Sequence, residues 1–176
     1  MNLYKNGYVV ADINNENSAY NAWPLSELKN DTVAEQLTDD AYEIWFYNYD
    51  MHHIIPDVNY IKTYQNYCNS IDLQTKILLF ESPDNNIVID DTPEIIEELG
   101  FDCLGTVYFS YLQSEYNDFK PELTERKIFP NKHGLFDKLE YVLYYIELRQ
   151  KDIASGINLE DFWEELPVRI SVVDIS

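Results

Sequence analysis

The chain has 176 residues, and 12 Lys and Arg side chains stand against 32 Asp and Glu, which gives a formal net charge of −20. Apolar residues make up 45% of the chain and aromatic residues 15%, so we expect a folded protein and not a disordered acidic tail. At about 150 residues per domain, the length predicts a single globular acidic domain over residues 1–176. The negative charge counts against nucleic acid and anionic membranes as direct partners and favours a basic protein.

The expected cellular location and the expected lack of a cofactor both come from sequence features that are not found. The N-terminus has no basic start and apolar run like those of a signal peptide, and no window approaches 18 consecutive apolar residues, so we expect a cytoplasmic protein. Cys68 and Cys103 sit among apolar residues and are expected to be reduced. No metal or cofactor is expected, because adjacent His52 and His53 would point to opposite faces of a strand and His133 has no motif around it.

The first half of the chain predicts alternating strands and helices. Tyr8–Ile13 is typical of a strand, and Leu25–Leu37 of a helix with Pro24 in its first turn. The aromatic and β-branched run Tyr42–Tyr49 predicts a second strand. Asp57 is a good N-cap for a helix. Its apolar stripe, with spacings of three and four, is Ile61, Tyr64, Cys68 and Ile71.

The middle of the chain begins with Lys76–Phe80, a short and nearly unbroken apolar run typical of a strand buried on both faces. Ile87–Ile89 predicts another short strand. A helix is then expected from Thr92 to Gly100, because Thr92 suits the N-cap, Pro93 the first turn and Gly100 the C-terminal end. Its inner face is predicted to be Ile95, Ile96 and Leu99.

The last part of the chain predicts a strand over Thr106–Leu112, a long helix over Leu135–Ile153 and a final strand over Val168–Ile175. Helices and strands are interspersed along the chain. The expected fold class is therefore α+β or α/β, with a mixed β-sheet packed by three to four helices in a single domain. The strand order stays open at this point.

The chain shows no motif for catalysis, so we expect no enzyme. Ser110 and Ser114 lack the glycines of a nucleophile elbow, and no glycine-rich phosphate loop is present. Cys68 lies on the apolar stripe of a helix, which indicates a core position. Paired carboxylates such as Asp90 and Asp91 do not follow the alternation of a calcium loop.

The most informative segment carries no positive charge. Between Lys76 and Lys120 there is no Lys or Arg, whereas ten Asp or Glu residues alternate with aromatic ones. Carboxylates around tyrosines suit a cationic protein, because tyrosine supplies contact area and charge steers the encounter. The residues predicted to contact such a partner are Asp90, Asp91, Glu94, Glu97, Glu98, Asp102, Tyr108, Tyr111, Glu115, Tyr116 and Asp118.

The same segment is also compatible with an acidic helix face in contact with water over core tyrosines, kept for solubility. Like-charged neighbours on a helix lose about 0.2–0.5 kcal/mol each, and we expect an external partner to offset that loss. Two weaker candidate patches are Asp39, Asp40 and Glu43 beside Trp45 and Tyr47, and the segment Glu160–Glu165.

Several short segments between about residues 76 and 175 resemble a loose pattern found in bacterial toxin-immunity proteins. They are Ile87–Glu94, Gly100–Asp102, Asn131–Phe136, Tyr145–Arg149 and Pro167–Ile170. The resemblance implies a cytosolic antitoxin that binds one cognate toxin domain, in many cases a basic nuclease. It carries no residue roles, so the contact residues above come from the charge pattern alone.

Three other functions stay open beside the antitoxin. A nucleic-acid mimic that inhibits a DNA- or RNA-binding defence protein would also be acidic, and would space its carboxylates like phosphates along one face. A small hydrolase or transferase would need a pocket with perturbed titratable groups. An intracellular scaffold needs neither. Both a monomer and a dimer are compatible with the sequence.

Overall fold

The computed structural model describes residues 1–12, 56–70, 72, 74–86, 88–90, 92–105, 110–156 and 165–175. The helix predicted over Leu25–Leu37 and the strand predicted over Tyr42–Tyr49 lie outside these residues. Two predicted contact residues, Asp91 and Tyr108, also lie outside them, as does the weaker acidic patch at 39–47.

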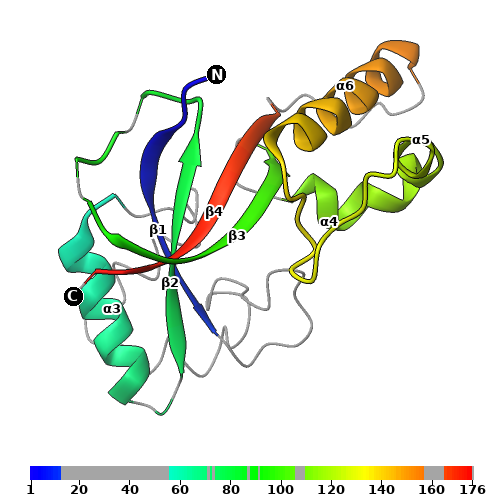
Figure 1. Ribbon diagram of the computed structural model, residues 1–176. Helices are drawn as coiled ribbons and strands as arrows, with labels where there is room; N and C mark the ends of the chain where they lie inside the picture. Colours follow the sequence, from blue (N-terminus) through cyan, green and yellow to red (C-terminus); the bar gives the residue numbers. More distant parts are fainter. Residues whose placement is uncertain are drawn as a thin grey trace.

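Four strands form one sheet in the order β1-β2-β4-β3 (Figure 1). They are β1 (Tyr4–Asp12), β2 (Thr75–Ser82), β3 (Glu94–Leu104) and β4 (Leu166–Asp174). The α+β class is confirmed. All three pairings of these strands are antiparallel, so the described part of the sheet lacks the parallel pairs of a mixed sheet. The reason is that β4 enters between β2 and β3 and runs opposite to both.

Helix α3 (Val58–Ser70) lies along one face of the sheet (Figure 1). Its predicted N-cap is confirmed, since the backbone N–H of Asn59 donates to Oδ1 of Asp57 at 2.8 Å. Ile61 and Cys68 of the predicted stripe are buried, so the core position of Cys68 is confirmed as well. Their neighbours in this cluster come from β1, β2 and the end of the chain: Tyr8, Val10, Ile77, Leu79, Val173 and Ile175.

The other face of the sheet carries a second cluster, because alternate residues of a strand point to opposite sides. Its buried members are Val9, Ala11, Leu78, Phe80, Leu99, Leu104, Leu135, Val168 and Ile170. Strand β2 contributes to both clusters and is buried on both faces, as its apolar run predicted.

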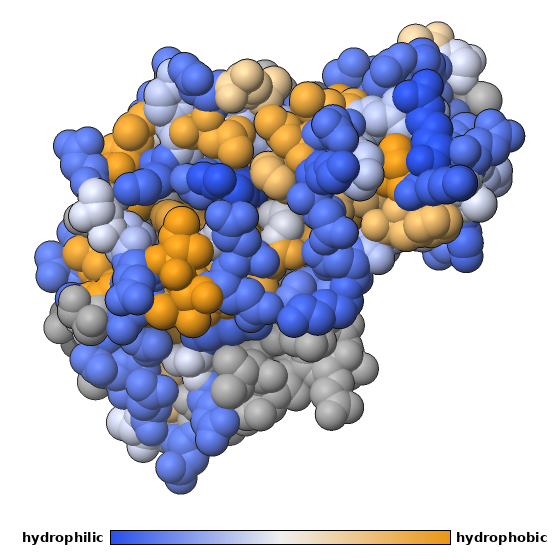
Figure 2. All heavy atoms as spheres, in the orientation of Figure 1, coloured by the Kyte–Doolittle hydropathy of each residue, from blue (hydrophilic) through white to orange (hydrophobic). Residues whose placement is uncertain are grey.

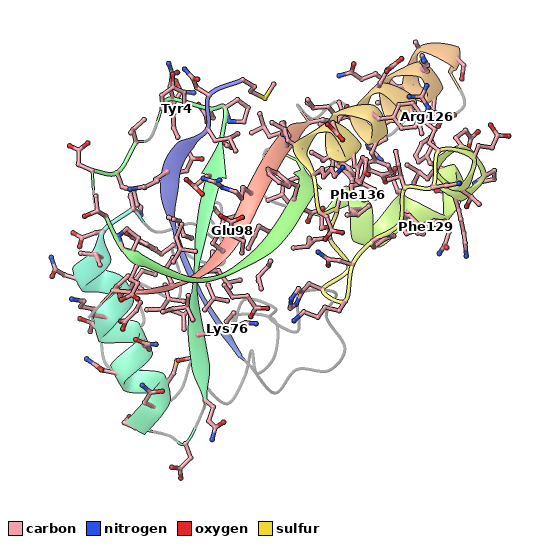
Figure 3. All side chains as sticks on the ribbon, in the orientation of Figure 1. Tyr4, Lys76, Glu98, Arg126, Phe129 and Phe136 are labelled. Atoms are coloured by element: carbon pink, nitrogen blue, oxygen red, sulfur yellow. The ribbon has the colours of Figure 1, made fainter. Side chains whose placement is uncertain are left out.

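A group of helices packs against the end of β3 (Figure 1). These are α4 (Tyr111–Glu115), the 3-10 helix η2 (Tyr116–Phe119), α5 (Lys120–Glu125) and α6 (Leu139–Ser155). Aromatic rings fill the space between them, with Phe119 and Phe136 edge-on to Tyr145 at centroid distances of 5.5 and 6.0 Å. Figure 3 shows Phe136 between β3 and these helices.

The helix predicted from Thr92 to Gly100 is wrong, since residues from Glu94 onward form β3. The backbone of this segment pairs with β4 over its whole length, and β-branched Ile95 and Ile96 suit a strand. Gly100 does not end a helix. Its φ is +133°, and a Cβ there would lie 2.7 Å from the carbonyl oxygen of Phe136, so glycine is needed for this close approach.

The segments on either side of β3 also differ from the prediction. Val88 and Ile89 are not in a strand, although the N–H of Ile89 donates to the carbonyl oxygen of Lys5 at 2.9 Å. Tyr111 and Leu112 were expected in a strand and begin α4, while residues 106–109 lie outside the described part. Helices η2 and α5 were not predicted; both are too short for a clear apolar period.

Helix α6 confirms the predicted long helix but begins at Leu139 and not at Leu135. Phe136, before the start of the helix, is not helical because it exchanges two backbone hydrogen bonds with Phe101 of β3, at 2.8 and 2.9 Å. Leu135 is therefore buried in the sheet cluster and does not belong to the helix. No helix in the described ranges is long and apolar enough to cross a membrane.

Candidate functional site

The predicted contact residues do not share one surface. Asp90, Glu94, Glu97 and Glu98 lie before and within the first half of β3 and are exposed. Glu115, Tyr116 and Asp118 lie in α4 and η2, next to the far end of β3 (Figure 1). Asp118 is exposed, and the other two are half-buried. The single acidic segment of the sequence is thus divided between two places.

The prediction that Asp102 contacts a partner is wrong, because its side chain is fully buried. Its Oδ1 accepts a hydrogen bond from the backbone N–H of Cys103 at 2.7 Å. Desolvation raises the pKa of this carboxyl to about 7, while hydrogen bonds from Ser110 and Cys103 act in the opposite direction. This carboxyl belongs to the interior beside the helices.

The prediction that Tyr111 lies at a contact surface is also wrong, because the residue is buried. Its ring lies under the guanidinium of Arg149, 3.7 Å from the centroid, and its carbonyl oxygen accepts the hydroxyl of Tyr145 at 3.0 Å. Arg149 is 1% exposed and forms ion pairs with Glu115 and with Glu165, the latter at 2.7 Å. The two carboxylates, including the one at the end of the weaker patch Glu160–Glu165, therefore share the single positive charge of Arg149 inside the fold.

The exposed part of the prediction forms what we call the acidic edge: Glu94, Ile95, Ile96, Glu97 and Glu98, the first five residues of β3. β3 is the last of the four described strands of the sheet, so among the described residues this segment has a strand neighbour on one side only. Ile95 is 45% exposed and Ile96 is 59% exposed. Figure 2 shows hydrophobic surface over the first half of β3, surrounded by hydrophilic side chains.

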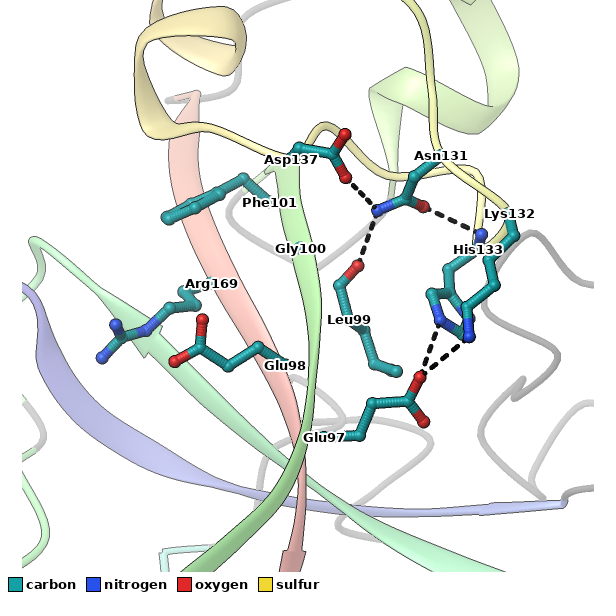
Figure 4. Close-up of a pocket in the computed structure, with 10 residues that line it drawn as sticks. All are labelled: Glu97, Glu98, Leu99, Gly100, Phe101, Asn131, Lys132, His133, Asp137 and Arg169. Carbon is teal, nitrogen blue, oxygen red and sulfur yellow. Dashed lines mark hydrogen bonds and ion pairs between the residues drawn. The ribbon is translucent and has the colours of Figure 1, made fainter.

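Glu97 is paired with a loop that is distant in the sequence (Figure 4). Its Oε1 lies 3.1 Å from Nζ of Lys132 and 3.2 Å from Nε2 of His133. The hydrogen bond from Lys132, followed by its charge and by His133, lowers the pKa of Glu97 below its usual range. Sequence reasoning took His133 as an ordinary loop residue and gave Lys132 no role.

Asn131 holds this loop against β3. Its amide nitrogen donates to the carbonyl oxygen of Leu99 at 2.8 Å and to Oδ1 of Asp137 at 2.9 Å. Its amide oxygen accepts the backbone N–H of His133 at 2.8 Å. The only sequence signal was the turn composition of Asn131–Gly134, since the partner Leu99 lies more than thirty residues earlier.

A pocket of about 230 Å³ opens where the loop meets the strand. Glu98, Phe101, Asp137 and Arg169 line it together with the loop residues (Figure 4). A His and several carboxylates could exchange protons there, yet the lining has no Ser, Thr, Cys or Tyr to act as a nucleophile. The lining combines three carboxylates with Lys132, Arg169 and His133, so its charges are largely balanced within the fold.

Three cations that are distant in the sequence lie near the acidic edge, so the fold already offsets part of its charge. Lys132 pairs with Glu97. Lys76 is partly buried, which lowers its pKa, while the nearby Glu97 raises it. Arg169 donates two hydrogen bonds to Glu81, at 2.6 and 2.8 Å, and these raise its pKa, with a smaller contribution from Glu98. The repulsion that an external partner was expected to offset is therefore already reduced in part by cations of the fold itself.

Comparisons of the chain with family models, with curated proteins and with solved structures find no match. The resemblance to toxin-immunity proteins therefore stays a prediction. No group of three metal-ligating His, Cys, Asp or Glu side chains occurs in the part of the chain that the structure describes.

Proposed function

We propose that this protein is a cytoplasmic inhibitor of the immunity type, which binds one basic protein, a toxin domain, and neutralises it. The observation that carries this proposal is the composition of the acidic edge. Three carboxylates and two largely exposed isoleucines lie together on the last strand of a sheet. Apolar side chains within a charged rim are typical of protein interfaces.

The physical account divides the work between charge and apolar area. A net charge of −20 speeds the approach of a basic partner, such as a nuclease whose substrate site is positive. Contact with Ile95 and Ile96 then slows dissociation, because removal of their exposed surface from water stabilises the complex. Of the tyrosines expected in this role, Tyr111 is buried against Arg149, and in this proposal the isoleucines of the acidic edge supply the apolar contact.

The alternative of a nucleic-acid mimic has less support. A mimic needs a row of carboxylates at phosphate-like spacing, whereas two isoleucines interrupt the acidic edge and Lys132 and Arg169 lie beside it. A hydrolase or transferase has a pocket with His133 and Glu97 in its favour, but that lining has no Ser, Thr, Cys or Tyr side chain to act as a hydroxyl or thiol nucleophile.

The proposal is tested by capture of the partner from cells that make this protein. The immobilised chain is exposed to a cell extract and washed at low and then at high salt, and retained proteins are identified by mass spectrometry. We expect one basic protein to survive the high-salt wash, to be toxic when expressed alone and to be harmless when co-expressed with this chain. A mixture of basic proteins that all elute with salt would overturn the proposal, because charge alone is salt-sensitive.

A matched pair of variants locates the interface. Glu94→Lys with Glu98→Lys reverses two charges of the acidic edge, and Glu122→Lys with Glu125→Lys makes the same change on exposed positions of α5. We expect the first variant to weaken binding of the captured partner by at least about tenfold and the second to change it about twofold or less. Equal weakening by both would show that net charge, and not the acidic edge, determines binding.

A further inference from the structure

The outer side of β3 is covered over part of its length only. Phe101 directs both its N–H and its C=O away from β4, toward Phe136, at 2.8 and 2.9 Å. In an antiparallel pair, such a residue lies opposite a partner with which it shares no backbone hydrogen bond. For Phe101 that partner is Arg169.

The same orientation recurs along β4. Arg169, Ser171 and Val173 are alternate residues of a strand without a register shift of its own, so their backbone groups face the same neighbour, β2. Their partners on β3 are Phe101, Glu98 and Ile95, in the same order. One extra, bulged residue of β3 lies between Phe101 and Glu98, and another lies between Glu98 and Ile95. The backbone N–H and C=O of Glu98 and Ile95 therefore point outward, as those of Phe101 do.

The covering segment ends before it reaches these two residues. Phe136 pairs with Phe101, and the side-chain amide of Asn131 bonds to the carbonyl oxygen of Leu99. Among the described residues, no backbone group hydrogen-bonds to the outer side of Glu98 or Ile95. Within the part of the chain that the structure describes, the acidic edge is thus an open sheet edge that continues the line of Phe136.

We propose that the acidic edge binds an extended segment of the basic partner as an added strand, paired through the outward backbone groups of Ile95 and Glu98. The inference rests on the proposed function and specifies how it is performed. Backbone hydrogen bonds to an open edge give affinity, and side chains along that edge select the sequence of the added strand. Here the carboxylates favour lysine or arginine on the added strand, and Ile95 and Ile96 favour branched apolar residues beside them.

Charge decides between a partner and a second copy of this chain. Two copies paired edge to edge would bring Glu94, Glu97 and Glu98 of each copy close together, and like charges on neighbouring strands are destabilising. Charged residues are a common protection of open edges against self-association. A basic strand meets opposite charges at the same positions, and its apolar residues contact Ile95 and Ile96, which are exposed.

The direct test is amide hydrogen exchange by NMR on the full chain, with a synthetic peptide of alternating lysine and valine as the probe. We expect the amides of Ile95 and Glu98 to become protected by at least about tenfold on addition of the peptide. The same peptide with methyl groups on alternate backbone nitrogens, and a glutamate–valine peptide, should give no protection. Unchanged exchange at these amides, or equal protection by the methylated peptide, would overturn the inference.

Two variants separate backbone pairing from charge. Glu98→Pro and Glu98→Gln both remove the carboxylate, but only proline removes the outward N–H, and proline is tolerated where that group faces solvent. We expect Glu98→Pro to bind the peptide at least about fivefold more weakly than Glu98→Gln. Equal weakening would mean that the peptide is held by side chains alone. If Glu98→Pro fails to fold, the exchange experiment on the unaltered chain still decides.

The two proposals fail in different ways. If a single basic partner is captured and neutralised while Ile95 and Glu98 exchange as in the free chain, strand addition is wrong and the inhibitor function stands. If the peptide protects these amides but the extract yields no specific partner, the edge is an acceptor of basic strands and the toxin-neutralising role is wrong. Protection that develops in the chain alone at high concentration would indicate self-pairing and would exclude the proposed occupant.

Discussion

The two halves of strand β3 pair with the same strand, β4, yet they form different kinds of surface. Residues 94–98 are exposed, whereas Leu99 and residues 102–104 are buried. The second half packs against Leu135, Phe136 and the helices, while the first half is held mainly by its backbone pairing with β4. Backbone pairing with β4 thus determines that the segment is a strand, and side-chain packing determines which half of the strand is buried in the core.

The carboxylates of the two halves show the same difference. Asp102 is buried among apolar groups, which raises its pKa to about 7. Glu97 lies at the surface, and the hydrogen bond from Lys132 lowers its pKa. Chemically similar side chains five residues apart on one strand are therefore shifted in opposite directions, by desolvation in one case and by a cation in the other.

The largest difference between the halves is expected from truncation of their apolar side chains. Leu99 is 1% exposed, so Leu99→Ala should lower the free energy of unfolding by about 2–5 kcal/mol, through lost burial and a cavity. Ile96→Ala, at an exposed site, should cost less than about 0.5 kcal/mol. Urea denaturation of both variants checks this. Similar losses would mean that the first half is packed in solution.

Gly100 marks the boundary between the halves and should be the next most sensitive position. Gly100→Ala places a Cβ 2.7 Å from the carbonyl oxygen of Phe136 at a φ of +133°, and we expect a loss of about 1–3 kcal/mol. Gly156→Ala is the matched control, because its φ is also positive and a Cβ there has no atom within 4 Å. Thermal unfolding should rank Gly100→Ala as the less stable variant, and the reverse order would contradict the close approach.

Asp102 should make stability depend on pH. Its pKa rises from 3.8 to about 7 on folding, so the folded protein retains a proton that the unfolded chain releases. The stability contributed by this proton is fully present below pH 3.8 and is lost as the pH rises through about 7. Between pH 6 and pH 8 the unaltered protein should lose about 1 kcal/mol more than Asp102→Asn. Urea titrations at both pH values measure this, and parallel pH profiles would contradict the burial of a carboxylic acid.

The smallest effect is expected at the surface ion pair of the first half. Lys132→Ala should raise the pKa of Glu97, because its main hydrogen-bond donor is removed. Stability should change by less than about 1 kcal/mol, since both side chains are largely exposed and water screens their charges. NMR titration of the Glu97 carboxyl reports the shift. An unchanged pKa would show that the pair does not persist in solution.

The sequence by itself determined the parts whose signals are local. The apolar run Lys76–Phe80, the N-cap Asp57 and the period of the long C-terminal helix each predicted an element that the structure contains. These signals depend on side-chain spacing and on bonds between near neighbours, which a sequence displays directly. The same is true of the charge: the acidic edge is a contiguous run of residues.

Only the tertiary structure decided the state of Glu94–Gly100 and the partners of its charges. Thr92, Pro93 and Gly100 have the local features of helix ends, but residues from Glu94 onward pair with β4 instead, and distant pairing overrides local propensity. Likewise Asp102 and Tyr111 are buried, and Lys132 reaches Glu97, because folding brings residues dozens of positions apart into contact. Burial and ion pairs between distant residues are properties of three-dimensional neighbours, which is why composition alone indicated an acidic protein and the structure indicated which of its acidic side chains are exposed.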